Sequence, residues 1–255
     1  MSNYSAIYLS PHLDDAALSC GGQIFQRTQA GERVLIVSVT AGDPMETAVS
    51  IYAHSLHQRW ELISDSVAGR RVEDKAACRI LGADYLHWHI LDCIYRTDEK
   101  TGAPFYVSDD QLFGPVHPTD QVQLLPRLAK QMQLLPSAKE IYVPLCIGHH
   151  VDHHLVRITA EFTFSQNILY YYEDYPYAQA SNVLTTVIPD DSYGWQSKTV
   201  TLSTVDKQAR IHAITAFISQ LNTFFTDQAD LEQQVYSYIA QVAGERIWYK
   251  TGENL

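Results

Sequence analysis

The stretch VLIVSV, residues Val34–Val39, decides the fold class, because it is almost continuously apolar and rich in β-branched side chains. Such a run is typical of a strand that is buried on both faces of a parallel sheet. A second short apolar run, Ala6–Leu9, precedes it and ends at Pro11. The segment between the two runs, from Asp14 to Thr28, reads as a helix with acidic residues in its first turn, where the helix dipole favours them. This order predicts a strand, a helix and a second strand.

The same alternation continues along the chain. Strands that alternate with helices predict a right-handed, mostly parallel sheet, a Rossmann-like α/β fold flanked by helices. The clusters of Gly and Pro predict a long surface loop over 97–118 and a polar loop near 189–194. The further expected strands are Tyr85–Leu91, Ile141–Leu145 and Ile168–Tyr172, and the further expected helices run from about Ser50 through Leu56, Trp60 and Ile63, from Val72 to Leu81 with Gly82 as the stop signal, and from Leu124 to Met132.

The chain reads as one domain of 255 residues. Residues 1–165 form the expected α/β core, and residues 166–255 form a C-terminal elaboration. Two helical stretches, around Val205–Phe225 and Leu231–Val242, complete that last third. The length is within the ordinary range for a single α/β domain, and no internal repeat is found.

Composition narrows the class of protein. An apolar fraction of 46% and a charged fraction of 18% are ordinary for a globular enzyme. The net charge of -11 argues against nucleic acid as a partner, because no basic excess is available to displace counterions from phosphates. No apolar stretch approaches a membrane span, and no signal peptide precedes Asp14, so the expected compartment is the cytoplasm. The sequence leaves the oligomeric state open.

The four cysteines form no C-x-x-C pair and lie far apart in apolar surroundings. We therefore expect buried thiols rather than disulfides or a thiolate metal site. They are Cys20, Cys78, Cys93 and Cys146.

The first cluster of candidate functional residues follows the first strand. His12 and Asp15 are three residues apart and can converge on one point, with Asp14 beside them as a second carboxylate. Ligands of open parallel sheets collect beyond the carboxyl ends of the strands, and this is such a place. The alternative is that Asp14 only caps the helix and that His12 is incidental.

The second cluster, residues Gly148–His154, follows the strand that ends at Leu145 and contains four histidines. On a helical turn, His150 and His153 share a face. Asp152 lies between them and can accept the second ring N–H of one histidine, which would fix its tautomer. His149 and His154 match no role and are expected either at the surface or packed behind the residues that hold the metal.

The two clusters are stronger together, because both fall at the same edge of the expected sheet. One histidine and one carboxylate from the first cluster and one histidine from the second make three ligands. Catalytic zinc needs three protein ligands and one open position. The remaining Asp and His then supply a base and an acid.

These two motifs resemble those of the PIG-L/LmbE-like family of zinc-dependent N-acetylglucosaminyl de-N-acetylases. The resemblance extends over nearly the whole chain. Weaker matches are Arg70-x-x-Glu73 on a helix that ends at Leu81-Gly82, Asp92, Tyr95-Arg96, Pro144-Leu145, the segment Tyr172–Tyr177 and the late Glu245–Trp248.

The resemblance implies which residues hold the metal. It makes His12, Asp15 and His153 the zinc ligands, so that residues 1–165 become the metal-binding core. Fe²⁺ fits the same nitrogen and oxygen donors, because affinity order alone does not determine the native metal.

The resemblance also implies the remaining roles. Asp14 becomes the general base. His150 becomes a charged histidine that stabilises the oxyanion and protonates the departing amine, and Asp152 orients it. Arg70 and Asp92 become substrate contacts.

Two positions depart from the family pattern. Many members carry Glu after the paired aspartates, where this chain has Ala16. Some members carry a tyrosine two residues before the histidine that matches His150, and here that position is Gly148. Stabilisation of the oxyanion then falls on zinc and His150, or on a tyrosine from elsewhere in the chain.

The function implied by the resemblance is metal-dependent hydrolysis of an N-acetyl group on an N-acetylated sugar or glycoside, a small-molecule substrate. Two alternatives stay open. One is an amidase for another N-acyl group, such as a thiol-conjugate amide, since both would use the same metal and water chemistry. The other is a zinc-binding or sugar-binding module without turnover.

Overall fold

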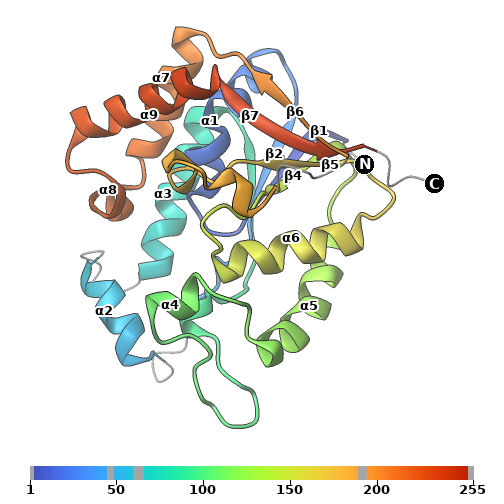
Figure 1. Ribbon diagram of the computed structural model, residues 1–255, viewed down its shortest axis with the longest axis vertical. Coiled ribbons are helices and arrows are strands. Elements are labelled where there is room, and N and C mark those ends of the chain that lie inside the picture. Colours follow the sequence, from blue (N-terminus) through green and yellow to red (C-terminus); the bar gives the residue numbers. More distant parts are fainter. Residues whose placement is uncertain (1–2, 45–48, 60–65, 189–193, 252–255) are drawn as a thin grey trace.

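The centre of the molecule is a seven-stranded mixed sheet with the order β3-β2-β1-β4-β5-β7-β6 (Figure 1). The computed structural model describes residues 3–44, 49–59, 66–188 and 194–251. Five strands are parallel, and β7 runs antiparallel to both β5 and β6. The predicted α/β fold is therefore confirmed. The strands are β1 (Tyr4–Ser10), β2 (Val34–Ser38), β3 (Asp84–His87), β4 (Ala138–Pro144), β5 (Leu169–Tyr172), β6 (Trp195–Val200) and β7 (Glu245–Lys250).

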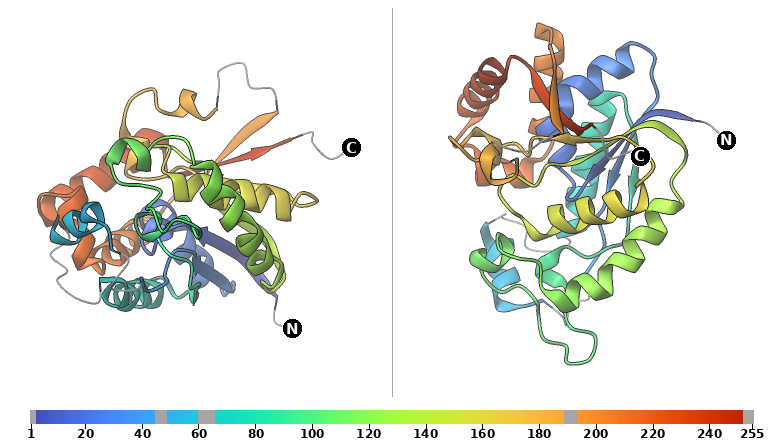
Figure 2. Two further views of the ribbon diagram at one scale, coloured as in Figure 1. Left: turned by 90° about the horizontal axis from the view of Figure 1, so that it is seen from below. Right: turned by 45° about the vertical axis from the view of Figure 1, so that its right-hand side comes forward.

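Helices cover both faces of the sheet (Figures 1 and 2). Helices α1, α3 and α7 pack together on one face, and α5 and α6 pack together on the other. The helices are α1 (Asp15–Gln29), α2 (Ile51–Arg59), α3 (Ser66–Leu81), α4 (Asp109–Leu112), α5 (Pro118–Gln133), α6 (Val151–Thr163), α7 (Thr204–Thr215), α8 (Ile218–Phe224) and α9 (Gln228–Val242).

The strand β1 shows how the sequence divides between the two faces. Ile7 and Leu9 belong to the apolar cluster that includes α5 and α6, whereas Ala6 and Tyr8 belong to the cluster under α1 and α3. This alternation follows from the period of two in a strand. All residues of β2 are buried, as the continuous run Val34–Val39 predicts.

Several element boundaries differ from the predictions. Both α3 and α5 begin earlier, at Ser66 and Pro118. Pro118 occupies the first turn, where its missing N–H costs nothing, so it starts the helix instead of belonging to a loop. The strand β3 ends at His87.

Two other loop and helix predictions need correction. The expected loop over 97–118 contains the short helix α4, and the expected helix over 205–225 is divided into α7 and α8 at Phe217. The predicted helical positions Trp60 and Ile63, and residues 189–193 of the predicted loop, lie outside the described residues.

The C-terminal elaboration adds two strands that the sequence did not predict, at the edge of the sheet opposite β3 (Figure 2). A buried ion pair connects the C-terminal elaboration to the core. Glu245 of β7 accepts the N–H groups of Gly22 and Gln23 in α1 at 2.9 and 2.8 Å. Arg210 of α7, which is 0% exposed, lies 3.3 Å from the same carboxylate. The first helix of the core is thus held by the last strand of the chain.

The predicted burial of the thiols is confirmed, because all four cysteines are buried and free of disulfides. Within the described ranges, no helix has both the length and the apolar content required to cross a membrane.

Candidate active site

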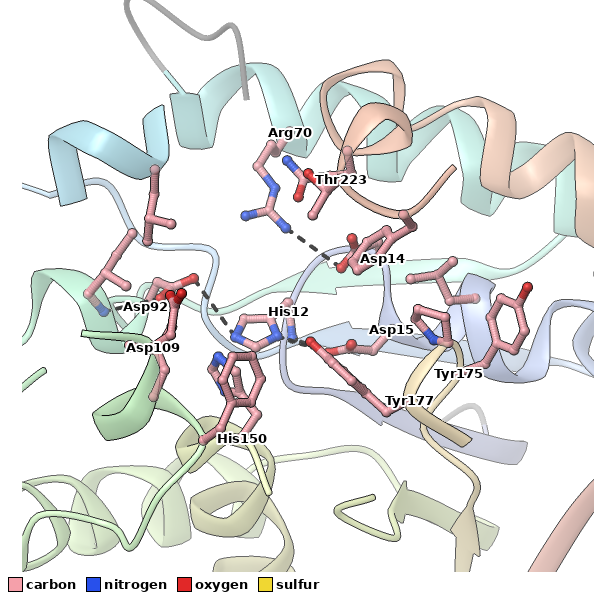
Figure 3. Close-up of a pocket in the computed structure, with 18 residues that line it drawn as sticks. His12, Asp14, Asp15, Arg70, Asp92, Asp109, His150, Tyr175, Tyr177 and Thr223 are labelled. Atoms are coloured by element: carbon pink, nitrogen blue, oxygen red, sulfur yellow. Dashed lines mark hydrogen bonds and ion pairs between the residues drawn. The ribbon is translucent and has the colours of Figure 1, made fainter. Parts of the chain in front are cut away.

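The two His/Asp clusters meet at one edge of the sheet (Figure 3). The first cluster follows β1, and the second follows β4, which pairs with β1 in parallel. Their carboxyl ends therefore lie side by side, as the sequence predicts. His12, Asp14, Asp15 and His150 line one cavity of about 170 Å³.

The turn after β1 is held by its own polar groups. Ser10 Oγ accepts the N–H of Ala16 at 3.0 Å, and Asp15 Oδ2 accepts the N–H of His12 at 2.7 Å. Asp14 occupies the N-cap position, but its side chain makes no capping hydrogen bond. The alternative interpretation of Asp14 as a helix cap is therefore wrong, and its carboxylate is available to the cavity.

Asp15 joins the two clusters. Its Oδ2 lies 3.3 Å from Nδ1 of His12 and 3.4 Å from Nε2 of His153. Burial alone would raise the pKa of Asp15, but the charges of His153 and His12 outweigh it and hold that pKa well below its usual range. The carboxyl group is therefore an anion placed between two imidazoles.

The imidazoles of the two clusters fit a metal ion. Ring nitrogens of His12, His150 and His153 lie within 4.8 Å of one another. His153 is 1% exposed, and its Nε2 is buried without a hydrogen-bond partner. A buried polar nitrogen without a partner is costly, and coordination of a metal would satisfy it. The donors are imidazole and carboxylate, a set that suits zinc and other first-row metals.

Asp174 holds the other nitrogen of His153, and sequence reasoning missed this role. Its Oδ1 lies 2.6 Å from Nδ1 of His153, and its Oδ2 accepts the N–H of Ile147 at 2.8 Å. Carboxylates commonly hold metal-binding imidazoles in this way. The available signal was position, because Asp174 follows β5, the strand next to β4.

The prediction that the carboxylate of Asp152 orients His150 is wrong. The contact between the two residues involves the backbone of Asp152. Nδ1 of His150 accepts the backbone N–H of Asp152 at 3.2 Å and caps α6. The carboxylate lies between Nη1 of Arg96 at 2.5 Å and Nε2 of His12 at 3.2 Å. Asp152 therefore connects the first cluster to Arg96.

Arg96 is a second residue whose place the sequence did not reveal. It is buried, and its Nη2 lies 2.8 Å from Oδ2 of Asp120. Tyr106 donates its hydroxyl to the same oxygen at 2.8 Å. The sequence match at Tyr95-Arg96 gave no role, because Asp120 and Asp152 reach Arg96 only through the fold.

Burial acts against a positive charge on His150. It has the largest effect, and the nearby His12 adds to it, so the pKa of His150 lies well below its ordinary value. The rings of His12 and His150 meet edge to face, with centroids 4.6 Å apart. The implied role of His150 as an imidazolium stays a prediction, and the burial of the ring opposes it.

Asp14, Arg70 and Asp92 all line the cavity, and the substrate contacts that the resemblance implies for Arg70 and Asp92 stay a prediction (Figure 3). Nη2 of Arg70, from α3, lies 3.6 Å from Oδ1 of Asp14. Burial raises the pKa of Asp14 in spite of Arg70, and a raised pKa suits a general base. Asp92 Oδ1 accepts the N–H of Ile94 at 3.2 Å, while its Oδ2 lies 3.8 Å from Nε2 of His12.

The opposite wall of the cavity is mostly apolar and comes from distant parts of the chain. Its residues include Leu112 and Phe113 near α4, Tyr175–Tyr177 after β5, and Gln220, Thr223 and Phe224 of α8. The cavity therefore combines a polar floor with a wall to which the C-terminal elaboration contributes.

Comparison with known proteins agrees with this geometry. A relative, 2'-N-acetylparomamine deacetylase from Niallia circulans, is 30% identical over 190 residues, which are 69% of this chain and 68% of that protein. A solved deacetylase–bog complex from the teicoplanin biosynthesis pathway has a TM-score of 0.82 at 25% identity and covers 98% of both chains. The zinc-inhibited form of teicoplanin deacetylase Orf2 has the same TM-score at 24% identity and the same coverage, and so shares the fold.

The family model described as PIG-L, GlcNAc-PI de-N-acetylase, matches residues 7–163. That match spans more than half of the chain and contains both His/Asp clusters. The chain therefore belongs to the PIG-L family of N-deacetylases.

Proposed function

We propose that this N-deacetylase takes the acetyl group from an amino sugar carried in a small glycoside. The main support for this proposal is the position of Asp15. Its Oδ2 lies 3.3 Å from Nδ1 of His12 and 3.4 Å from Nε2 of His153, and Asp14 lines the cavity beside it. The relative from Niallia circulans is described as acting on 2'-N-acetylparomamine. The cytoplasm is our proposed compartment, on the sequence argument alone.

His12, Asp15 and His153 would hold the metal, and zinc is the proposed ion. A metal in this place supplies Lewis-acid chemistry, because it polarises an acyl oxygen and lowers the pKa of a bound water. Fe²⁺ is the second candidate, since the same donors suit both metals.

Asp14 and His150 would then move and hold the protons. Asp14 accepts the proton of the attacking water as a general base. Nδ1 of His150 accepts a backbone N–H, so its single ring proton lies on Nε2. That N–H can donate a hydrogen bond to the carbonyl oxygen as negative charge develops there. Asp14 then passes this proton to the departing nitrogen as the C–N bond breaks, so acetate and a free amine are the products.

Arg70 and Asp92 remain the proposed contacts to the polar groups of the substrate. Both are buried at the cavity floor. The apolar wall, with Phe113 and Phe224, offers surfaces for the faces of sugar rings. A sugar that carries its acetamide towards Asp14 would contact both kinds of surface.

The proposed function is tested with a panel of amides and a defined metal content. We expect release of acetate from N-acetylglucosamine glycosides and N-acetylated aminoglycosides, loss of turnover on chelation, and recovery when about one equivalent of metal is restored. Metal is added only to stoichiometry, because one solved relative is described as a zinc-inhibited form.

The panel also contains a thiol-conjugate amide and longer N-acyl sugars. Preference for one of these would correct the substrate class while keeping the metal chemistry. Binding of sugar without turnover of any amide, in protein with full metal content, would contradict the proposed function and favour a binding module.

Asp174→Asn is expected to weaken metal binding by roughly 10–100-fold, because residues that hold metal-binding histidines contribute about this much. The amide can accept the N–H of His153 but cannot supply a full negative charge 2.6 Å from it. Metal affinity is measured by competition with a chromogenic chelator. The matched control is Asp84→Asn, which removes an exposed carboxylate paired with Arg33. Equal affinity in the two variants would refute a role for Asp174 at the metal.

A further inference from the structure

Gly148 and Tyr177 share one volume at the cavity. Gly148 has φ +90°, and a Cβ built on it would lie 2.7 Å from Cγ and 3.0 Å from Cδ1 of Tyr177. Such distances are too short for real atoms, so no other residue fits at 148 without moving the ring. The tyrosine ring therefore fills the space that a side chain two residues before His150 would need.

Tyr177 belongs to the segment after β5, and its ring lies among the groups of the site (Figure 3). In this view, the ring points from its backbone towards Asp15 and His12. Its ring centroid lies 5.8 Å from that of Phe113, edge to face, and Phe113 in turn lies 5.4 Å from His150. These aromatic contacts fix the direction of the ring.

The hydroxyl of Tyr177 remains a proton donor. Burial is the main cause that raises its pKa, and the charges of Asp15 and Asp14 add to it. The group therefore keeps its proton over the whole range in which an amidase would work.

Hydrolysis of an amide needs donors that face the carbonyl oxygen, because this oxygen gains charge as the carbon becomes tetrahedral. The polar floor supplies few of them. Asp14, Asp15 and Asp92 are acceptors, and Arg70 lies against Asp14 at 3.6 Å. Besides His150, Tyr177 is a donor at the cavity whose ring points towards Asp15 and His12.

We propose that Tyr177 is a catalytic residue that donates a hydrogen bond to the acetyl oxygen in the transition state. Its ring occupies the space that a side chain at position 148 would otherwise fill. The phenol keeps its proton throughout, so no bond to it forms or breaks. This inference rests on the proposed function, since it assigns a donor to the same reaction.

Tyr177→Phe tests the hydroxyl alone, because the ring keeps its contacts with Gly148 and Phe113. We expect kcat to fall about 10²–10³-fold, the usual cost of one oxyanion donor, with KM changed by less than about threefold. Metal content and the unfolding midpoint are measured on the same preparation and should match the wild type. The matched control is Tyr170→Phe, which removes a hydroxyl from β5, where the ring stacks on Tyr142.

A binding measurement separates a catalytic hydroxyl from a structural one. A methylphosphonamide of glucosamine imitates the tetrahedral carbon, whereas glucosamine itself imitates only the product. Calorimetry on metal-loaded protein should show the phosphonamide bound at least tenfold more weakly by Tyr177→Phe, with glucosamine bound equally well. If Tyr177→Phe loses metal or stability, the two affinities are compared on the metal-loaded fraction of that variant, and equal weakening of phosphonamide and glucosamine overturns the role of Tyr177.

The outcomes distinguish this inference from the proposed function. Full turnover and unchanged phosphonamide affinity in Tyr177→Phe, beside an active wild type, overturn the role of Tyr177 and leave the deacetylase standing. A metal-loaded wild type that cleaves no amide of the panel overturns both.

Discussion

Asp14→Asn is expected to lower kcat by roughly two to four orders of magnitude, the range for a general base, while the metal and the fold are retained. The reason lies in its surroundings. The side chain of Asp14 does not cap α1, lines the cavity, and has a raised pKa caused by burial. Asparagine has nearly the same shape and can still face Arg70, but it cannot accept a proton from water.

The variant Asp15→Asn, at the neighbouring position, distinguishes the general base from the metal ligand. Because Asp15 Oδ2 lies between His12 and His153, this variant should lose metal along with activity. Metal per chain is measured by plasma mass spectrometry, and kcat is measured at one equivalent of added metal. If Asp14→Asn loses the metal and Asp15→Asn keeps it, the two carboxylates have been assigned in reverse.

His153→Ala is expected to abolish metal binding and turnover, and also to reduce the free energy of unfolding. Removal of one ligand leaves two of the three proposed donors. It also leaves the carboxylate of Asp174, which is 1% exposed, without the imidazole 2.6 Å away. A buried charge that loses its partner in this way costs about 3–5 kcal/mol.

Urea unfolding and metal analysis together test this second prediction. The matched control is His154→Ala, the next residue on α6, which stacks on His149 away from the cluster. This control should keep its metal and nearly all of its stability. Wild-type metal content in His153→Ala would exclude it as a ligand.

The sheet and the meeting of the two clusters could be predicted, because both follow from local sequence. Val34–Val39 is too uniformly apolar for an exposed strand, and parallel strands bring their carboxyl ends to one edge. His12 and Asp15 lie just after one such strand, and His153 lies just after another. Spacing and position were therefore enough to bring the two clusters together, whereas the choice of these three residues as metal ligands came from the resemblance to the family and stays a prediction.

The contacts around that cluster could not be predicted, because they join residues far apart in the chain. Asp152 was expected to serve His150, its near neighbour, but its carboxylate contacts Arg96 and His12 instead. Asp174 reaches His153 only because β5 pairs with β4. Sequence spacing carries no information about which of several nearby acids a buried cation selects.

The starts of two helices were misplaced for a related reason. Pro118 and Ser66 lie before the apolar periodicity that marks each helix. The first turns therefore lacked the hydrophobic pattern from which a helix is predicted. In α5, His117 caps the start by accepting the N–H of Thr119. Histidine is not among the preferred N-cap residues, and the signal was therefore absent.

The buried carboxylate of Glu245 has a consequence for anyone who builds chimeras from this chain. It accepts two N–H groups of α1, the helix whose first turn carries Asp15, and it pairs with Arg210. We propose that the chain folds as one unit for this reason. The part before residue 165 and the part after it would then not be exchangeable with those of a relative. A chimera could contain Arg210 without an acid at position 245, or the acid without the arginine. Either combination would leave one buried charge without its partner. Recombination between relatives would therefore succeed only where Arg210, Glu245 and the Gly22 turn of α1 are inherited together.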